Sequence, residues 1–131
     1  MEVTATRLID QARQVRQRAH APYSRFFVGS ALEADEGRIF TGCNVENASY
    51  GLTVCAERAA VFKAISEGCR EFTRIAIVTG TEVGTPPCGA CCQVLWELCG
   101  NLEVILANMD TWIETVQLAD LLPRPFHASF S

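Results

Sequence analysis

The sequence of 131 residues lacks several features that would each assign it to a class of protein. It has no run of about 20 apolar residues, the length that spans a bilayer. Its formal net charge is −4, whereas a polynucleotide-binding surface needs a basic face. Its opening stretch, residues 1–20, is amphipathic and has no apolar centre of a secretory signal. We therefore expect a cytoplasmic protein that binds neither membrane nor polynucleotide.

A disulfide framework is also not expected. The chain has seven cysteines, an odd number, and the cytoplasm keeps thiols reduced. Apolar residues make up 49% and charged residues 20%, which is typical of a folded globular chain. Since no repeat, linker or low-complexity tract interrupts it, we expect a single domain over residues 1–131. The cysteines therefore need an explanation other than cross-linking.

Apolar periodicity predicts that strands and helices alternate along most of the chain. Leu8, Ala12, Val15 and Ala19 share one face of a first helix, which Pro22 would end. Two strands around a turn at 35–37 follow. Then come a helix, a strand, a helix, a strand and a helix, at 55–69, 72–80, 89–100, 102–108 and 115–122. This alternation predicts parallel neighbouring strands and a three-layer α/β/α domain.

Three cysteines lie where they could bind a metal. Cys88 and Cys91 form C-x-x-C at the start of a predicted helix, and Cys55 opens another helix two residues before Glu57. The partial positive charge of a helix N-terminus stabilises thiolates, the form that binds metal. Three thiolates would hold zinc and leave its fourth position for water, whose proton Glu57 could accept. Because residues i and i+2 diverge on a helix, this requires Cys55 at the very first position.

Other interpretations of these cysteines remain open. C-x-x-C alone also fits a thiol-redox pair, and a structural zinc would need a fourth ligand from Cys92, His20 or His127. The whole pattern C-A-E … P-C-x-x-C, with about 30 residues between its parts, is more specific. It corresponds to the signature of the zinc nucleotide deaminases, with cysteine in place of the first histidine.

The chain resembles the small cytidine deaminase family from about residue 21 to residue 126. The stretches that carry the resemblance are "APYSRFFVGSAL", "GCNVENASYGLTVCAERAAV", "PCGACCQVLWEL" and "LLPRPF". It implies a three-layer α/β/α sandwich around a mixed five-stranded sheet, a homotetramer and one zinc ion per subunit. It also implies hydrolysis of cytidine and 2′-deoxycytidine to uridine and 2′-deoxyuridine with release of ammonia.

The resemblance also assigns roles to individual residues. The zinc ligands would be Cys55, Cys88 and Cys91, and the proton shuttle would be Glu57. The residues expected to bind the nucleoside are Phe26 at the base, Asn44 and Glu46 at the ribose hydroxyls, Ala56 through its backbone N–H, Tyr50 near a subunit boundary, and Phe126 in a neighbouring subunit's pocket. Arg58 is expected to hydrogen-bond a ligand sulfur and so to tune the metal.

The chain departs from the family at two positions. Cys92 stands where the family has arginine, so one positive charge that would offset the thiolates is missing, and we expect Cys92 to be a buried apolar residue. Ser30 replaces an alanine, a change that we expect to be minor. Three further cysteines are also expected to be buried apolar residues: Cys43, Cys69 and Cys99.

Two other functions remain as alternatives. A deaminase of a cytosine-nucleoside antibiotic such as blasticidin S shares the zinc motif, although the intact "NVENASYG" favours an ordinary ribose. A non-catalytic zinc-binding or thiol-redox module belongs to another class. Glu57 discriminates between the classes, because only an enzyme would lose turnover when Glu57 is replaced by glutamine.

Overall fold

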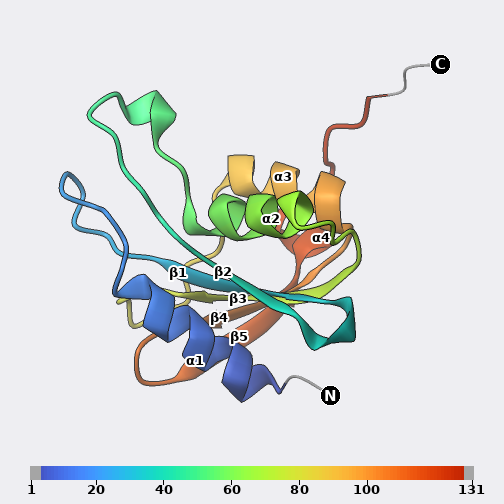
Figure 1. Ribbon diagram of the computed structural model, residues 1–131, viewed down its shortest axis with the longest axis horizontal. Coiled ribbons are helices and arrows are strands. Elements are labelled where there is room, and N and C mark those ends of the chain that lie inside the picture. Colours follow the sequence, from blue (N-terminus) through green and yellow to red (C-terminus); the bar gives the residue numbers. More distant parts are fainter. Residues whose placement is uncertain (1–3, 129–131) are drawn as a thin grey trace.

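The computed structural model describes residues 4–128, which fold around one mixed sheet (Figure 1). Its five strands lie in the order β2-β1-β3-β4-β5. Their bounds are Gly29–Ala34 for β1, Ile39–Cys43 for β2, Phe72–Val78 for β3, Glu103–Ala107 for β4 and Trp112–Gln117 for β5. Only β3 and β4 are parallel neighbours; the other pairs are antiparallel. The expected mixed five-stranded sheet and the hairpin of β1 and β2 are confirmed.

Helices cover both faces of this sheet, which confirms the three-layer architecture (Figure 1). Helix α1, Ala5–Arg16, packs on one face, where Leu8, Ile9 and Ala12 are buried. Helices α2, Ala56–Ser66, and α3, Gly89–Cys99, pack on the other face over the larger apolar cluster. The short α4, Leu118–Leu121, extends that cluster beside α3, and single 3₁₀ turns lie at Asp35–Gly37 and Tyr50–Leu52.

The first helix ends earlier than its apolar spacing predicts. Helix α1 stops at Arg16, so Ala19 is not on its face and Pro22 does not end it. The backbone of His20 instead pairs with the segment after β2: its N–H donates to Asn44 at 2.9 Å and its carbonyl accepts from Glu46 at 2.8 Å. A hydrogen-bonded bridge between distant segments thus overrides the local helical pattern.

The last predicted helix is wrong in its first half. Residues 115–117 belong to β5, which pairs with β4 in the register Val104 with Val116 and Glu103 with Gln117, and only Leu118–Leu121 is helical. The periodicity in the sequence does not reveal β5. It is an edge strand whose side chains are mostly exposed or half-buried, so it has no strong apolar alternation.

Close packing of α2 on the hairpin depends on Gly42. A methyl group there would lie 2.4 Å from the Ala56 carbonyl oxygen and 2.5 Å from the Ala60 nitrogen. Directly opposite Gly42 in the register, the buried Ser30 hydroxyl donates to the same Ala56 carbonyl at 2.8 Å. Ser30 therefore ties the first turn of α2 to the sheet, and this bond fixes the N-terminus of α2.

No helix among residues 4–128 is long and apolar enough to cross a membrane. The longest, α1, has 12 residues, whereas about 20 apolar residues are needed. The single domain expected over 1–131 includes the first and last three residues, which lie outside the described range.

Replacing Gly42 by alanine should destabilise the protein by roughly 1–3 kcal/mol, because the added methyl group must push α2 off the hairpin. The measurement is the free energy of unfolding in urea. Gly51→Ala is the matched control, since a methyl group at Gly51 would meet nothing within 4 Å. Equal stabilities of the two variants would contradict this account of the packing.

Candidate metal centre and adjoining cavity

The three motif cysteines meet where two helices begin. Cys55 is the N-cap of α2 and Cys88 the N-cap of α3; both have extended backbone, and neither thiol caps its own helix. Cys91 lies in the first turn of α3. The three sulfur atoms lie within 4.8 Å of one another, with 3.4 Å between those of Cys88 and Cys91.

This donor set suits zinc with an open coordination position. Within residues 4–128, the group that could hold a metal consists of these three thiols, and Cys92, His20 and His127 are not part of it. Sulfur ligands are typical of zinc sites, and structural zinc sites almost always have four protein ligands. Three ligands therefore favour a reactive site over a closed structural one.

The charges around Cys55 favour its thiolate. The hydrogen bond from the Cys91 thiol, together with the Arg58 guanidinium, lowers the pKa of Cys55 from 9.0 to about 5. The same pairing with Cys55, together with burial, raises the pKa of Cys91. Cys91 thus keeps its proton and donates it in a hydrogen bond to the Cys55 thiolate, and a divalent cation bound here would displace that proton.

Arg58 provides the positive charge nearest to the sulfurs. Its Nη2 donates to Cys55 Sγ and to the Thr53 carbonyl, each at 3.4 Å. These contacts raise the pKa of Arg58, the hydrogen bond to Cys55 contributing most. The Arg58 Nε is buried without a hydrogen-bond partner. The side chain therefore serves the sulfur cluster rather than a surface ion pair.

Glu57 is buried beside the thiols. It is 4% exposed, and burial raises its pKa from 4.5 to about 7, with a smaller contribution from the Cys55 anion. The extended cap conformation of Cys55 lets both side chains face the same site, which an ideal helix would not allow. A carboxyl group with a pKa near neutrality can both accept and donate a proton at physiological pH.

Cys55, Cys88 and Glu57 form one end of a cavity of about 310 Å³, whereas the buried Cys91 does not line it. Seven of the residues singled out from the sequence line it: Phe26, Asn44, Glu46, Cys55, Ala56, Glu57 and Cys88. Its wall is mostly apolar, with a few polar groups, as is usual for sites that bind small molecules. The cavity lies at the carboxyl end of β3, next to the N-termini of α2 and α3.

Asn44 and Glu46 already have partners in the loop that precedes β1. Asn44 accepts from the Val28 N–H at 2.9 Å and donates to the Phe26 carbonyl at 2.7 Å. Glu46 accepts from the N–H groups of Tyr23 and Ser24 and from the Ser24 hydroxyl, whose hydrogen bond is the main reason for its lowered pKa. Both side chains thus shape the cavity wall.

Comparison with known proteins agrees with this geometry. The profile of the family "Cytidine and deoxycytidylate deaminase zinc-binding region" matches residues 3–107, most of the chain. The chain belongs to this family. The family is defined by a zinc-binding region, so the expected metal is zinc. In this chain the group that could hold it is the cluster of Cys55, Cys88 and Cys91.

Individual family members are similar over nearly their full length. A cytidine deaminase of Halalkalibacterium halodurans is 51% identical over 122 residues, covering 92% of each chain. One of Sporosarcina psychrophila is 48% identical over 121 residues, covering 92% of this chain and 89% of the relative. The crystal structure of cytidine deaminase from Burkholderia pseudomallei superposes with a TM-score of 0.90 at 49% identity, covering 95% of this chain and 100% of that one. These matches do not favour the antibiotic-deaminase or redox-module alternatives.

Tyr50 and Phe126 are not brought to the cavity of their own chain. Tyr50 is 74% exposed and touches the ring of Tyr23 edge-on at 6.0 Å between centroids. Phe126 is 70% exposed, and its backbone N–H and carbonyl are both bonded by the side-chain amide of Gln93. Both aromatic residues are thus largely exposed to solvent and do not line the cavity beside the thiols.

Sequence reasoning missed about half of the cavity wall. Ser24, Val28 and Thr53 lie near the residues it found, and Pro86 and Pro87 directly precede Cys88, so the motifs themselves pointed there. Thr85 directly precedes Pro86 in the same stretch. Ile77 and Thr79 had no such signal; they reach the cavity because they lie at the carboxyl end of β3 and just after it.

The remaining cysteines behave differently from one another. Cys92 is 2% exposed and packs in the main core with its thiol donating to the Pro87 carbonyl at 3.4 Å, which confirms that it is a buried residue. Cys43, Cys69 and Cys99 are half-buried rather than buried as expected, because they lie at or just beyond the ends of β2, α2 and α3.

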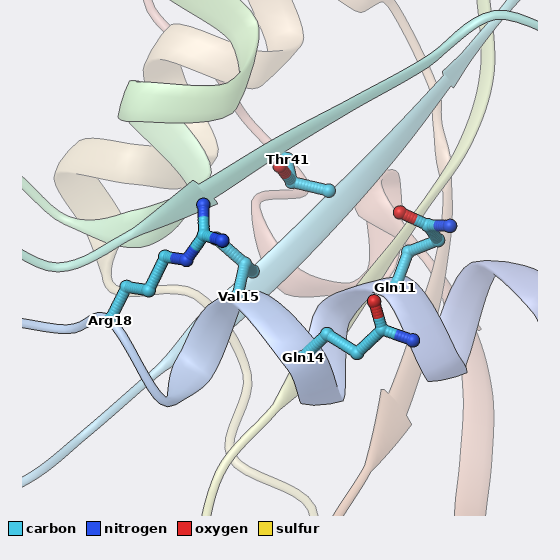
Figure 2. A pocket seen from close by; sticks show the side chains of 5 residues that line it. All are labelled: Gln11, Gln14, Val15, Arg18 and Thr41. Carbon is cyan, nitrogen blue, oxygen red and sulfur yellow. The ribbon is translucent and has the colours of Figure 1, made fainter.

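A second, smaller groove lies between α1 and β2 (Figure 2). Its volume is about 140 Å³, and five residues line it: Gln11, Gln14, Val15, Arg18 and Thr41. Figure 2 shows these side chains flanking the gap between the helix and the edge strand. None of the five is a carboxylate, thiol or imidazole, so this groove offers neither zinc ligands nor an acid–base group.

Replacing Cys55, Cys88 or Cys91 singly by serine should lower bound zinc to well below one ion per chain, because a hydroxyl group is a much poorer zinc ligand than a thiolate. Metal analysis of the purified proteins measures this. Cys69→Ser is the control that should keep its zinc, since Cys69 is a free cysteine outside the cluster. Full zinc content in all three cluster variants would contradict the assignment.

In zinc-free protein, Glu57→Gln should become more stabilising as the pH rises. The folded-state pKa of Glu57, about 7, lies above its ordinary value of 4.5, so the stability that the protonated carboxyl contributes is present below pH 4.5 and is lost as the pH rises through 7. Glutamine avoids this loss. The difference in unfolding free energy should grow between these two values, by about 3 kcal/mol in total, and then level off. A difference independent of pH would show that burial does not control this carboxyl.

Proposed function

We propose that the chain catalyses the hydrolytic deamination of cytidine and 2′-deoxycytidine to uridine and 2′-deoxyuridine, releasing ammonia. The observation that carries this proposal is the cluster of three thiols within 4.8 Å beside a buried Glu57, at the end of a cavity of about 310 Å³. The near full-length similarity to proteins named cytidine deaminase supports the choice of substrate.

Glu57 performs the proton transfers of this reaction. When bound at Cys55, Cys88 and Cys91, zinc supplies the Lewis acidity that makes a water molecule nucleophilic at neutral pH. Glu57 accepts a proton from that water and delivers it to N3 of the cytosine ring. The water oxygen becomes bonded to C4. Glu57 then takes the remaining proton from this oxygen and passes it to the exocyclic amino group, so that the bond from C4 to that nitrogen breaks, ammonia leaves and the C4 carbonyl of uridine forms.

The nucleoside is held by groups on the other walls of the cavity. Phe26 packs on the base, and the backbone N–H of Ala56, at the first position of α2, has no acceptor within its helix and can donate to the base. Asn44 and Glu46 bind the ribose hydroxyls while they keep their bonds to the loop. Their fixed orientation supports this role, because preorganised groups lose little freedom on binding.

We further propose that the enzyme works as a homotetramer in the cytoplasm. Phe126 is 70% exposed on a segment anchored by Gln93, and Tyr50 is 74% exposed, so each could reach a neighbouring subunit's cavity. Large exposed aromatic residues favour subunit contacts. All seven cysteines are free, which suits a reducing compartment.

Glu57→Gln should lower kcat for cytidine by roughly 10²–10⁴-fold, because glutamine cannot carry the proton. Zinc content should stay at that of the wild type. Loss of cytidine absorbance measures turnover, and Glu71→Gln, an exposed glutamate after α2, is the control expected to retain full activity.

Unimpaired turnover in Glu57→Gln would contradict the assigned role. A wild-type protein that binds zinc but deaminates blasticidin S and not cytidine would favour the antibiotic alternative. Bound zinc without turnover of either compound would favour a non-catalytic module.

A further inference from the structure

The loop that presents Phe26 to the cavity contains a strained residue. Arg25, directly before Phe26, has a φ of 61°, a left-handed conformation that costs a residue with a side chain roughly 1 kcal/mol or more. The loop is not part of the sheet, since β1 begins only at Gly29. Its conformation must therefore be maintained by hydrogen bonds from the elements around it.

One set of these hydrogen bonds comes from Asn44, just after β2, and from Ser24 within the loop. Asn44 bonds the backbone of Phe26 and Val28, and the Ser24 hydroxyl accepts from the Phe26 N–H at 3.0 Å. The Phe27 carbonyl, which lies between these two anchored residues, is not part of this set. This carbonyl instead accepts a hydrogen bond from a side chain on the other side of the loop.

The donor to Phe27 is Arg16, the last residue of α1. Its Nε lies 2.9 Å from the Phe27 carbonyl oxygen. The helix can approach this closely because position 29 is glycine: a methyl group there would lie 2.1 Å from the Ala12 carbonyl and 2.8 Å from the Arg16 Cβ. Arg16 thus clamps the loop from the face of the sheet opposite the zinc site.

The same guanidinium lies against a second segment beside the cavity. A methyl group at Gly80 would lie 2.7 Å from the Arg16 Nη2, so the guanidinium would have to shift if position 80 carried a side chain. Gly80 follows Thr79, which is 1% exposed and lines the cavity. The loops meet here because Gly29 pairs with Val78 in the sheet register.

We propose that Arg16 is a positioning residue. It fixes the loop that carries Phe26 relative to the segment that carries Thr79, on two sides of the cavity, and thereby sets the affinity for the nucleoside base. It touches neither the cavity nor the thiols, so it acts through the Phe27 carbonyl and the Gly80 backbone. That the ligand is a nucleoside rests on the proposed function. That Arg16 holds the loop through the Phe27 carbonyl does not depend on it.

The test compares Arg16→Ala and Arg16→Lys with wild type. In Arg16→Ala, KM for cytidine should rise about tenfold, the factor that corresponds to loss of one charged hydrogen bond, while kcat and zinc content change little. Arg16→Lys should lie in between, because an ammonium can bond Phe27 but cannot also span to Gly80. Gly80→Ala, which displaces the guanidinium without removing it, should raise KM in the same direction.

A second measurement needs no substrate. Trypsin cleaves after arginine, and Arg25 is exposed in the clamped loop, so the rate of cleavage between Arg25 and Phe26, followed by mass spectrometry, reports loosening of the loop. We expect about tenfold faster cleavage in Arg16→Ala, the same factor by which loss of the bond favours the open loop. If Arg16→Ala does not fold, Gly80→Ala and Arg16→Lys give the same readouts.

Arg13→Ala is the matched control. Arg13 lies one turn earlier on α1, and its Nε likewise donates to a loop carbonyl, that of Asn108 at 3.0 Å, but Asn108 does not line the cavity. It should leave KM and the cleavage after Arg25 unchanged. Equal effects in the Arg13 and Arg16 variants, or an unchanged cleavage rate in the Arg16 variants, would overturn the proposal. A wild type without cytidine turnover would instead contradict the proposed function and leave the cleavage test intact.

Discussion

Three sulfur atoms and a carboxyl group occupy one small volume, and the need to offset their negative charge governs the rest of the site. Thiolates alone would repel one another and a charged Glu57. The structure limits this repulsion in three ways: the Cys91 thiol donates a hydrogen bond to Cys55, burial raises the pKa of Glu57 to about 7, and Arg58 lies against Cys55. Two helix N-termini add partial positive charge to the same place. A bound zinc ion would offset the remaining negative charge of the thiolates, so the site favours a cation.

The sheet determines the position of the helix N-termini that carry the thiols. The close contacts at Gly42 and the Ser30 hydroxyl fix the first turn of α2, and α3 begins after the loop that leaves β3. Gly29 does the same for α1 on the opposite face. The cavity is therefore bordered by segments that enter and leave neighbouring strands, and small shifts in either helix would be felt at its walls. Ser30 and Cys92 both have a place in this packing: Ser30 donates a hydrogen bond to the first turn of α2, and Cys92 packs in the main core.

Prediction from the sequence succeeded where chemistry demands residue types at short spacing. The cysteines and the glutamate stand in short motifs that can be recognised locally, and the structure brings Cys88, Cys91 and Glu57 to one place. Buried strands such as β3 have a continuous apolar run. It failed where partners come from distant segments. β5 is an exposed edge strand defined only by its pairing with β4, and the end of α1 is set by the bridge between His20 and Val45. Arg16 and Thr79 carry no motif, because their place beside the cavity follows from sheet register.

X-ray absorption spectroscopy of the zinc in the purified protein tests the central claim most directly, since it counts the sulfur atoms bound to the metal. The account predicts three sulfurs at about 2.3 Å and one oxygen or nitrogen at about 2.0 Å, the pattern of an open site with a water ligand. Four sulfurs would mean that Cys92 closes the site as a structural ligand. Fewer than three would mean that the two helix N-termini do not form the metal centre.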